Sequence, residues 1–152
     1  MFPETALVTG AAGGIGRALV TALEADGAVV RGLDLADGFD VSDWDAWQGV
    51  EPADAVFLNA GVLASGDGSL ADYRRIIGVN VDGVVFGVQA LAPRMQRGSA
   101  FVVTASLAGL IPMASDPLYA LTKHAVVGYA RSMADVLEPR GIRINLVNPG
   151  IV

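Results

Sequence analysis

The chain has 152 residues and a formal net charge of −6, and its 53% hydrophobic against 17% charged residues is too apolar for a disordered chain, so we expect one folded domain spanning residues 1–152. The acidic balance, without a Lys/Arg cluster, argues against nucleic-acid and membrane partners, and zero Cys with one His leaves no metal site to expect. Seeing neither an apolar run of membrane-spanning length nor a basic leader segment, we expect a cytoplasmic protein.

Short apolar runs alternate with segments of helical periodicity along the whole chain. The runs are apolar on both faces, as in the buried strands of a parallel sheet. We therefore predict an α/β fold, a doubly wound parallel sheet of the Rossmann type with helices on both faces. In chain order the expected elements are a strand at 5–9, a helix at 17–25, strands at 28–34 and 54–59, a helix at 70–97, a strand at 99–106, a helix at 117–138 and a strand at 142–147.

A glycine-rich turn connects the first expected strand to the first helix. Gly10, Gly14 and Gly16 let the backbone adopt positive φ and approach a ligand closely, and the N–H groups at the start of the helix attract an anion. The spacing is neither that of a P-loop nor the common G-x-G-x-x-G. We interpret the turn as a cradle for a pyrophosphate, with tight packing of helix on strand as the alternative.

Asp34 ends the second expected strand, 18 residues after Gly16. A carboxylate near this distance accepts hydrogen bonds from the adenosine ribose hydroxyls of NAD and repels the 2′-phosphate of NADP. Leu35 follows, where an arginine could have accommodated that phosphate. The pair favours NAD over NADP, with Asp34 as an ordinary surface-loop acid as the alternative.

The segment 34–45 carries five aspartates and is too short for a complete crossover helix. Its spacing does not fit a calcium loop, so most of these acids are expected to be solvated. Ser42, with Asp45 three residues later, predicts the N-terminal cap of a short helix through Trp44 and Trp47.

The helix expected between Asn80 and Ala92 is apolar nearly all round. Such a helix must be buried on more than one side, either in a large core or against another subunit. We therefore expect a homo-oligomer, a dimer or tetramer, formed through the apolar helices near 80–97 and 117–138.

Tyr119 and Lys123 lie four residues apart in the last expected helix and therefore share one of its faces. A phenol with a pKa near 10 is a poor acid–base catalyst at neutral pH, and a nearby ammonium favours its phenolate form. Lys123 is the only lysine among ten basic residues. This indicates a position that requires the compact charge of an ammonium rather than the broad guanidinium of arginine. The pair predicts a site of proton transfer, whereas His124 points elsewhere and is expected in packing or at the surface.

Six motifs along the whole chain, in their order and spacing, resemble those of the short-chain dehydrogenase/reductase family. Their glycine and Tyr-to-Lys spacings are similar to the simple alcohol/ketone branch, and the stretches 106–112 and 123–128 look closest to NAD-dependent hydroxyprostaglandin dehydrogenases. The motifs are Thr9-Gly10-x-x-x-Gly14-x-Gly16, Asn59-Ala60-Gly61, Asn80, Ser106, Tyr119-x-x-x-Lys123 and Asn148-Pro149-Gly150.

This resemblance implies an NAD-dependent oxidoreductase that interconverts a secondary alcohol and a ketone. Tyr119 would be the general acid/base, and Lys123 would hold the nicotinamide ribose and favour the phenolate. Ser106 would bind the substrate oxygen and Asn80 would position a water in a proton relay; alone, they would be an ordinary strand-end serine and an ordinary helix residue. NAD contacts would come from Gly10, Gly13, Gly14, Ile15, Gly16, Asp34, Leu35, Asp40 and Val41 (at the adenine edge), Asn59, Ala60, Gly61, Tyr119, Lys123, Pro149, Gly150 and Ile151.

The family usually continues beyond the Pro-Gly turn into a substrate-covering lid, a helix and a last strand, whereas this chain stops at Val152. The lid and the last strand are therefore expected to be missing. Two interpretations follow: an oxidoreductase represented by its cofactor-binding and catalytic half, which acts on a small alcohol or ketone, or a non-catalytic dinucleotide-binding or interaction module.

Overall fold

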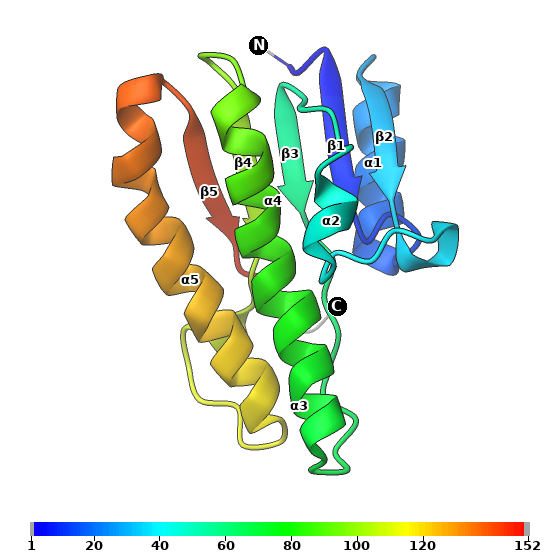
Figure 1. Ribbon diagram of the computed structural model, residues 1–152, viewed down its shortest axis with the longest axis vertical. Coiled ribbons are helices and arrows are strands. Elements are labelled where there is room, and N and C mark those ends of the chain that lie inside the picture. The colour runs from blue at the N-terminus through cyan, green and yellow to red at the C-terminus, as the bar shows by residue number, and fades with distance from the viewer. Residues whose placement is uncertain (1, 151–152) are drawn as a thin grey trace.

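The structure, a computed structural model, describes residues 2–150 and is built on a five-stranded sheet (Figure 1). Every strand pairing is parallel, and the order β2-β1-β3-β4-β5 confirms the predicted Rossmann-type α/β fold. The strands are β1 (Thr5–Thr9), β2 (Val29–Leu33), β3 (Ala55–Leu58), β4 (Ala100–Thr104) and β5 (Arg143–Val147). The α-helices are α1 (Gly14–Ala25), α2 (Trp44–Trp47), α3 (Leu70–Ile77), α4 (Gly83–Leu91) and α5 (Pro117–Leu137).

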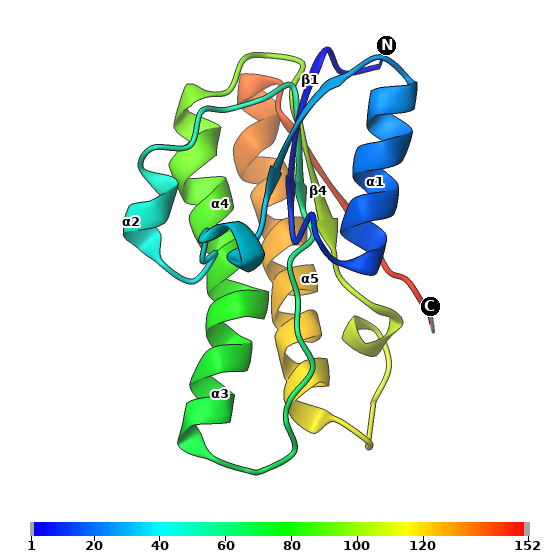
Figure 2. The same ribbon diagram turned by 90° about the vertical axis from the view of Figure 1, so that its right-hand side faces the viewer.

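Helices cover both faces of the sheet, as Figure 2 shows: α1 lies on one face, and α2, α4 and α5 lie on the other. The larger core fills the space between the sheet and α2, α4 and α5, and includes the fully buried side chains of Leu7, Trp47 and Phe101. A smaller core, with Val8 and Leu23, lies under α1. Leu7 and Val8 are neighbours on β1 and point to opposite faces, which is why this strand is apolar throughout.

The long apolar helix expected around residues 70–97 consists of α3, a π-turn at Gly78–Asp82, α4 and a final 3₁₀ turn at Ala92–Arg94. Contrary to the expectation that no apolar run reaches membrane-spanning length, the helical stretch Leu70–Arg94 contains a window with mean hydropathy 1.5. By length and composition alone this stretch could cross a membrane. Half of that window is buried inside the fold, which is the pattern of a core helix.

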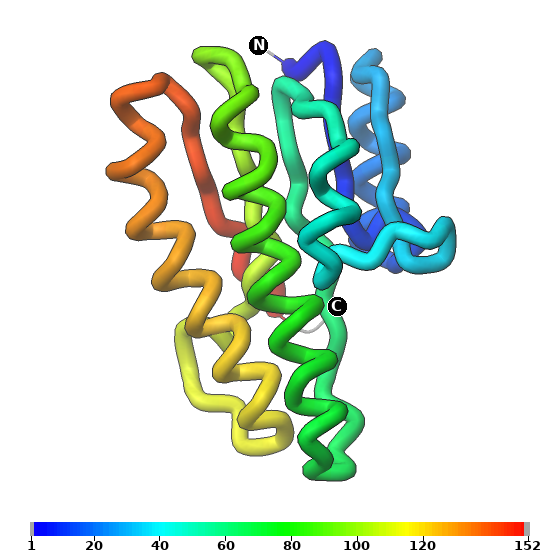
Figure 3. Tube along the Cα trace, viewed as in Figure 1, coloured from blue at the N-terminus to red at the C-terminus, as the bar shows by residue number. Residues whose placement is uncertain are grey.

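Between β2 and β3 the chain makes a 3₁₀ turn at Leu35–Asp37 and then forms the four-residue helix α2 before it reaches β3, as Figure 3 shows. The expected Ser42 cap is wrong, because the Asp43 side chain caps α2 by accepting a 3.0 Å hydrogen bond from Asp45 N. Ser42 Oγ instead donates to Asp40 Oδ1 at 2.7 Å. Ser42 and Asp43 are adjacent, and either side chain could cap α2. The Ser42 hydroxyl is bonded to Asp40, so Asp43 caps the helix.

The carboxyl ends of β1 and β3 lie side by side, at the point where the order of the strands reverses. Thr9 ties them together: its Oγ1 accepts hydrogen bonds from Asn59 N at 2.9 Å and Ala60 N at 3.1 Å. In doubly wound sheets the ligand crevice opens at this reversal. The fold therefore places its crevice beside the glycine-rich turn.

Candidate active site

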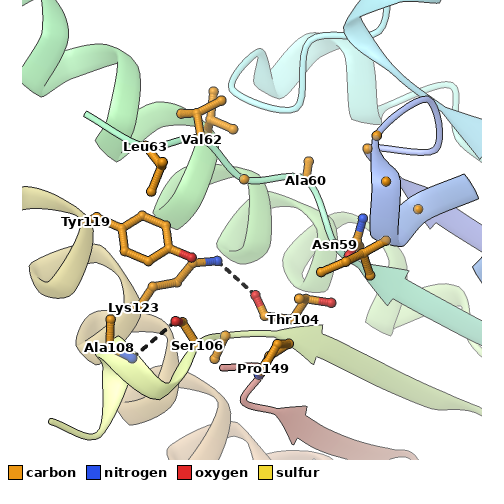
Figure 4. A pocket seen from close by; sticks show the side chains of 18 of the residues that line it. Asn59, Ala60, Val62, Leu63, Thr104, Ser106, Ala108, Tyr119, Lys123 and Pro149 are labelled. Atoms are coloured by element: carbon orange, nitrogen blue, oxygen red, sulfur yellow. Dashed lines mark hydrogen bonds between the residues drawn. The ribbon is translucent and has the colours of Figure 1, made fainter. Parts of the chain in front are cut away.

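A cavity of about 1200 Å³ opens at the carboxyl ends of the strands (Figure 4). It brings together residues that are far apart in the sequence, from the glycine turn after β1 to the Pro-Gly turn after β5. The predicted site residues that line it are Gly10, Gly13, Gly14, Ile15, Gly16, Asp34, Leu35, Asp40, Val41, Asn59, Ala60, Gly61, Ser106, Tyr119, Lys123, Pro149 and Gly150.

The glycine turn forms one wall of the cavity, and close backbone contacts require glycine at positions 10 and 16. Gly10 has φ +66°, and a Cβ on Gly16 would lie 2.0 Å from the Gly10 carbonyl oxygen. Gly14, the first residue of α1, has open space where a Cβ would be. The N-terminus of α1 therefore faces the cavity with bare backbone, and a negatively charged group can approach it.

Asn59 lines the same part of the cavity and is incompletely paired. Its Nδ2 donates to Thr9 O at 3.1 Å, while its buried Oδ1 has no hydrogen-bond partner among residues 2–150. A buried polar atom without a partner is costly, so Asn59 Oδ1 is suited to accept a hydrogen bond from a ligand. Together with the bare glycine turn, this orphaned atom shows that the residues present fit a dinucleotide.

Asp34 braces the glycine turn from the end of β2. Its Oδ2 accepts a 2.9 Å hydrogen bond from Ala12 N, and its Oδ1 accepts a 3.0 Å bond from Ala36 N. Each carboxylate oxygen has a second lone pair, so Asp34 can still accept hydrogen bonds from a ligand in the cavity. The carboxylate thus joins the turn to the chain after β2.

The opposite end of the cavity holds Ser106, Tyr119 and Lys123, which come from the end of β4 and the first turns of α5 (Figure 4). Lys123 Nζ lies 5.4 Å from the centre of the Tyr119 ring and donates a 2.9 Å hydrogen bond to Thr104 O. Ser106 Oγ accepts a 3.1 Å bond from Ala108 N, which leaves its own hydrogen free to donate. The three side chains therefore offer a phenol, a hydroxyl and an amine within one recess.

Lys123 is buried, with 3% of its side chain exposed, and burial lowers its pKa from the ordinary 10.5 to about 8. Desolvation penalises the charged form, so the shift is downward as expected for a buried amine. A Cβ on Gly61 would lie 3.3 Å from Lys123 Nζ, so this glycine makes room for the ammonium. At pH 7 the amine is still mainly protonated and can act as a positive charge beside Tyr119.

Asn80 does not line the cavity, unlike the other predicted catalytic residues. Its amide is buried in the π-turn, where Oδ1 accepts from Val62 N at 2.8 Å and Nδ2 donates to Val62 O and to Thr122 Oγ1. It therefore holds the loop after β3 against α5, and its role in a relay stays a prediction.

Ile151, a further predicted cofactor contact, lies outside the described residues. Residues that line the cavity but were missed are Ala12, Phe39, Val62, Leu63, Val79, Thr104, Ala105, Leu107, Ala108, Ile111, Pro112 and Met113.

Asp116 positions Tyr119, a role that the sequence analysis missed. Its Oδ1 accepts a 2.9 Å hydrogen bond from Tyr119 N and so caps α5, and its Oδ2 accepts a 3.0 Å bond from Ala64 N. The signal was present, because an aspartate followed by Pro117 is a typical helix start. Tyr119 thus sits in a capped first turn, on a rigid element.

A family model for short chain dehydrogenases matches residues 42–152. The chain belongs to the short-chain dehydrogenase/reductase family. The match covers α2 to β5 and the recess with Ser106, Tyr119 and Lys123.

Relatives within the short-chain dehydrogenase/reductase family agree with this assignment. The whole chain is 35% identical, over 183 aligned positions, to 70% of a 3-alpha-(or 20-beta)-hydroxysteroid dehydrogenase of Mycobacterium tuberculosis. A short-chain dehydrogenase/reductase from Burkholderia phymatum, solved in complex with NAD, matches 98% of the chain with TM-score 0.81 and 29% identity, over 66% of its own length. BdcA in complex with NADPH matches 97% of the chain with TM-score 0.88 and 28% identity, over 70% of its own length.

The comparison also shows a difference in length between this chain and one relative. The 183 aligned positions exceed the 152 residues of this chain, so the mycobacterial relative has extra positions within the aligned region. In this chain the connection from β2 to β3 covers residues 34–54 and includes the four-residue α2. The residues of this connection that line the cavity are Asp34, Leu35, Phe39, Asp40 and Val41.

Proposed function

We propose that this chain binds NAD and interconverts a secondary alcohol and a ketone, with Tyr119 as the general acid/base. The observation that carries the proposal is that Ser106, Tyr119 and Lys123 meet at one end of a cavity whose other end is a bare glycine turn. A dinucleotide lying along the cavity would bring its reactive ring toward the three side chains. The dehydrogenases among its relatives support alcohol and ketone chemistry.

The residues that would hold the dinucleotide are Gly10 to Gly16 at the pyrophosphate, Asp34 at the adenosine ribose and Asn59 to Gly61 along the middle. The cofactor, when bound, supplies the acceptor for the hydride that leaves the carbinol carbon. The preference for NAD rests on Asp34, whose carboxylate repels a 2′-phosphate, and on exposed Leu35, which offers that phosphate no positive charge. Structural relatives with NAD and with NADPH are both known, so the preference needs its own test.

Proton transfer belongs to the chain's own residues. In oxidation the Tyr119 phenolate takes the proton of the substrate hydroxyl, while Ser106 Oγ–H donates a hydrogen bond to the same oxygen. The Lys123 ammonium stabilises negative charge on the phenol oxygen by Coulomb attraction, and the bond to Thr104 O fixes its position. In reduction the same groups act in reverse, with Tyr119 returning the proton.

The cavity wall near Ser106 indicates the character of the substrate. Leu63, Leu107 and Ile111 line the cavity and are exposed. These apolar side chains favour a substrate with an apolar body beside its reacting oxygen.

We also propose that the protein forms a homo-oligomer through the apolar helices near 80–97 and 117–138. The exposed Leu121 and Val136 of α5 support this, and α4 and α5 lie side by side on one face of the molecule (Figure 1). The molar mass in solution, measured by light scattering, tests this part of the proposal.

Tyr119→Phe tests the catalytic assignment, because it removes the hydroxyl and keeps the ring. We expect turnover of a panel of secondary alcohols to fall about 100-fold or more, with NAD affinity largely kept. Tyr73→Phe is the matched control, since Tyr73 does not line the cavity and its change should leave turnover unaltered. Undiminished turnover in Tyr119→Phe would refute the assignment, and NAD binding without turnover in the wild type would favour a dinucleotide-binding module.

A further inference from the structure

Trp47 occupies the space between α4 and the sheet in the connection from β2 to β3. Its side chain is fully buried. A Cβ on Gly87 of α4 would lie 3.0 Å from Trp47 Cη2 and 2.6 Å from Leu58 Cδ2, so the indole packs where helix and strand come closest. One large side chain thus anchors a helix of only four residues.

Trp47 touches the wall of the cavity from behind at two points. Its Nε1 donates a 2.9 Å hydrogen bond to Val41 O, and the Phe39 ring stands edge-on to the indole with ring centres 5.1 Å apart. Phe39 and Val41 both line the cavity, and so does Asp40 between them, whereas Trp47 does not. The indole therefore supports three successive lining residues without facing the ligand space.

The other contacts of this wall hold the side chains of Asp40 and Val41, whereas the Val41 carbonyl is held by Trp47. The Asp40 side chain is bonded to Ser42, and the Val41 side chain lies in a notch at Gly83, where a Cβ would be 2.8 Å from Val41 Cγ2. Val41 is buried, so water could not replace the indole N–H as the hydrogen-bond donor to its carbonyl if that N–H were removed. A buried carbonyl without a partner favours rearrangement of the backbone that carries it.

We infer that Trp47 is a positioning residue for the adenine half of the dinucleotide, which it serves by holding the Phe39–Val41 wall in place. The inference rests on the proposed function, because it takes Asp40 and Val41 as the adenine edge of the cavity. The wall lies on the β2 side of the glycine turn, while Tyr119 and Lys123 lie on the α5 side. Loss of the support should therefore weaken one half of the ligand and spare the other.

Trp47→Phe tests the inference, because it removes the indole N–H and keeps an aromatic ring in the core. We expect the Kd of ADP-ribose to rise about three- to tenfold, as for the loss of one hydrogen bond, and the Kd of nicotinamide mononucleotide to change less than about twofold. Trp44→Phe is the matched control: Trp44 is exposed, packs against Phe86 and does not line the cavity, so both affinities should stay unchanged.

A second measurement uses the wild-type chain and does not depend on the folding of a variant. The chain has two tryptophans, so its NMR spectrum should show two indole N–H resonances, assigned with Trp44→Phe. The Trp47 resonance should shift on titration with ADP-ribose and stay in place with nicotinamide mononucleotide. An unshifted Trp47 resonance, an unchanged Kd in Trp47→Phe, or equal weakening of both ligands overturns the inference. Failure of the wild type to bind ADP-ribose or NAD overturns the proposed function instead.

Discussion

Replacing Lys123 by methionine removes the only lysine of the chain from a buried position, and keeps an unbranched side chain there. Burial lowers the pKa of Lys123 from 10.5 to about 8. Because one pKa unit corresponds to about 1.4 kcal/mol, keeping the buried amine charged costs the folded state about 3 kcal/mol. The folded pKa is the net balance of burial and of the bond from Nζ to Thr104 O, so Lys123→Met should be about 3 kcal/mol more stable than the wild type at pH 7.

The pH dependence gives the sharper test. Between pH 8 and 10.5 the unfolded chain binds more protons at Lys123 than the folded chain, so the free energy of unfolding contributed by this residue rises with pH. Relative to Lys123→Met, the wild type should gain about 3 kcal/mol over this range, which closes the difference in unfolding free energy present at pH 7. Below pH 8 both states hold the proton and the difference should be constant.

Urea unfolding without dinucleotide, followed by the fluorescence of buried Trp47, measures these free energies at each pH. Groups that titrate far from Lys123 affect both proteins alike and cancel in the difference, and making both measurements in the Tyr119→Phe background removes the phenol on which the ammonium acts. Lys123→Arg is a further control, because a guanidinium keeps its charge throughout this range. A wild-type minus Lys123→Met difference that stays flat from pH 7 to 10.5 would refute the argument that burial holds the pKa of Lys123 down.

Three further substitutions probe the opposite end of the cavity. Gly16→Ala puts a Cβ 2.0 Å from the Gly10 carbonyl oxygen, so we expect a loss of about 2 kcal/mol or more in unfolding free energy. Gly14→Ala, with open space at its Cβ, should stay within about 0.5 kcal/mol of the wild type in the same urea titration, and equal losses would contradict the packing argument. Asp34→Ala removes the brace on Ala12 N and the repulsion of a 2′-phosphate, so titration calorimetry should show weaker NAD binding and a smaller preference over NADP. An unchanged preference would show that Asp34 does not set it.

The order and type of the main elements could be predicted from the sequence, because β1, β3 and β4 are apolar runs and α1 and α5 follow a helical pattern. The prediction was less accurate where neighbouring polar residues compete. Ser42 and Asp43 both suit a helix cap, and only the fold shows that Ser42 is bonded to Asp40. The start of α1 at Gly14, three residues before the expected Arg17, was hidden because glycine is a poor indicator of helix.

The candidate site was predictable where one side chain carries the chemistry, and less so where the backbone does. The spacing of Tyr119 and Lys123 places both in one recess by helical geometry alone. Thr104, whose carbonyl receives the Lys123 hydrogen bond, gives no signal of its own, because any residue at that position offers the same group. Asn80 is the opposite case: the sequence pattern predicts a catalytic role, whereas in the structure its buried amide is hydrogen-bonded to Val62 and Thr122.

A single, secluded side-chain amine also makes the protein a convenient object for chemical labelling. The neutral form of an amine is the nucleophile that attacks an acylating reagent and displaces its leaving group, and a pKa of about 8 makes that form abundant for Lys123 in mildly alkaline buffer. The barrier to modification is then access rather than reactivity, because the amine is enclosed beside Tyr119 and Thr104. The rate at which mass spectrometry detects an acyl adduct at Lys123 would therefore report how often the recess opens.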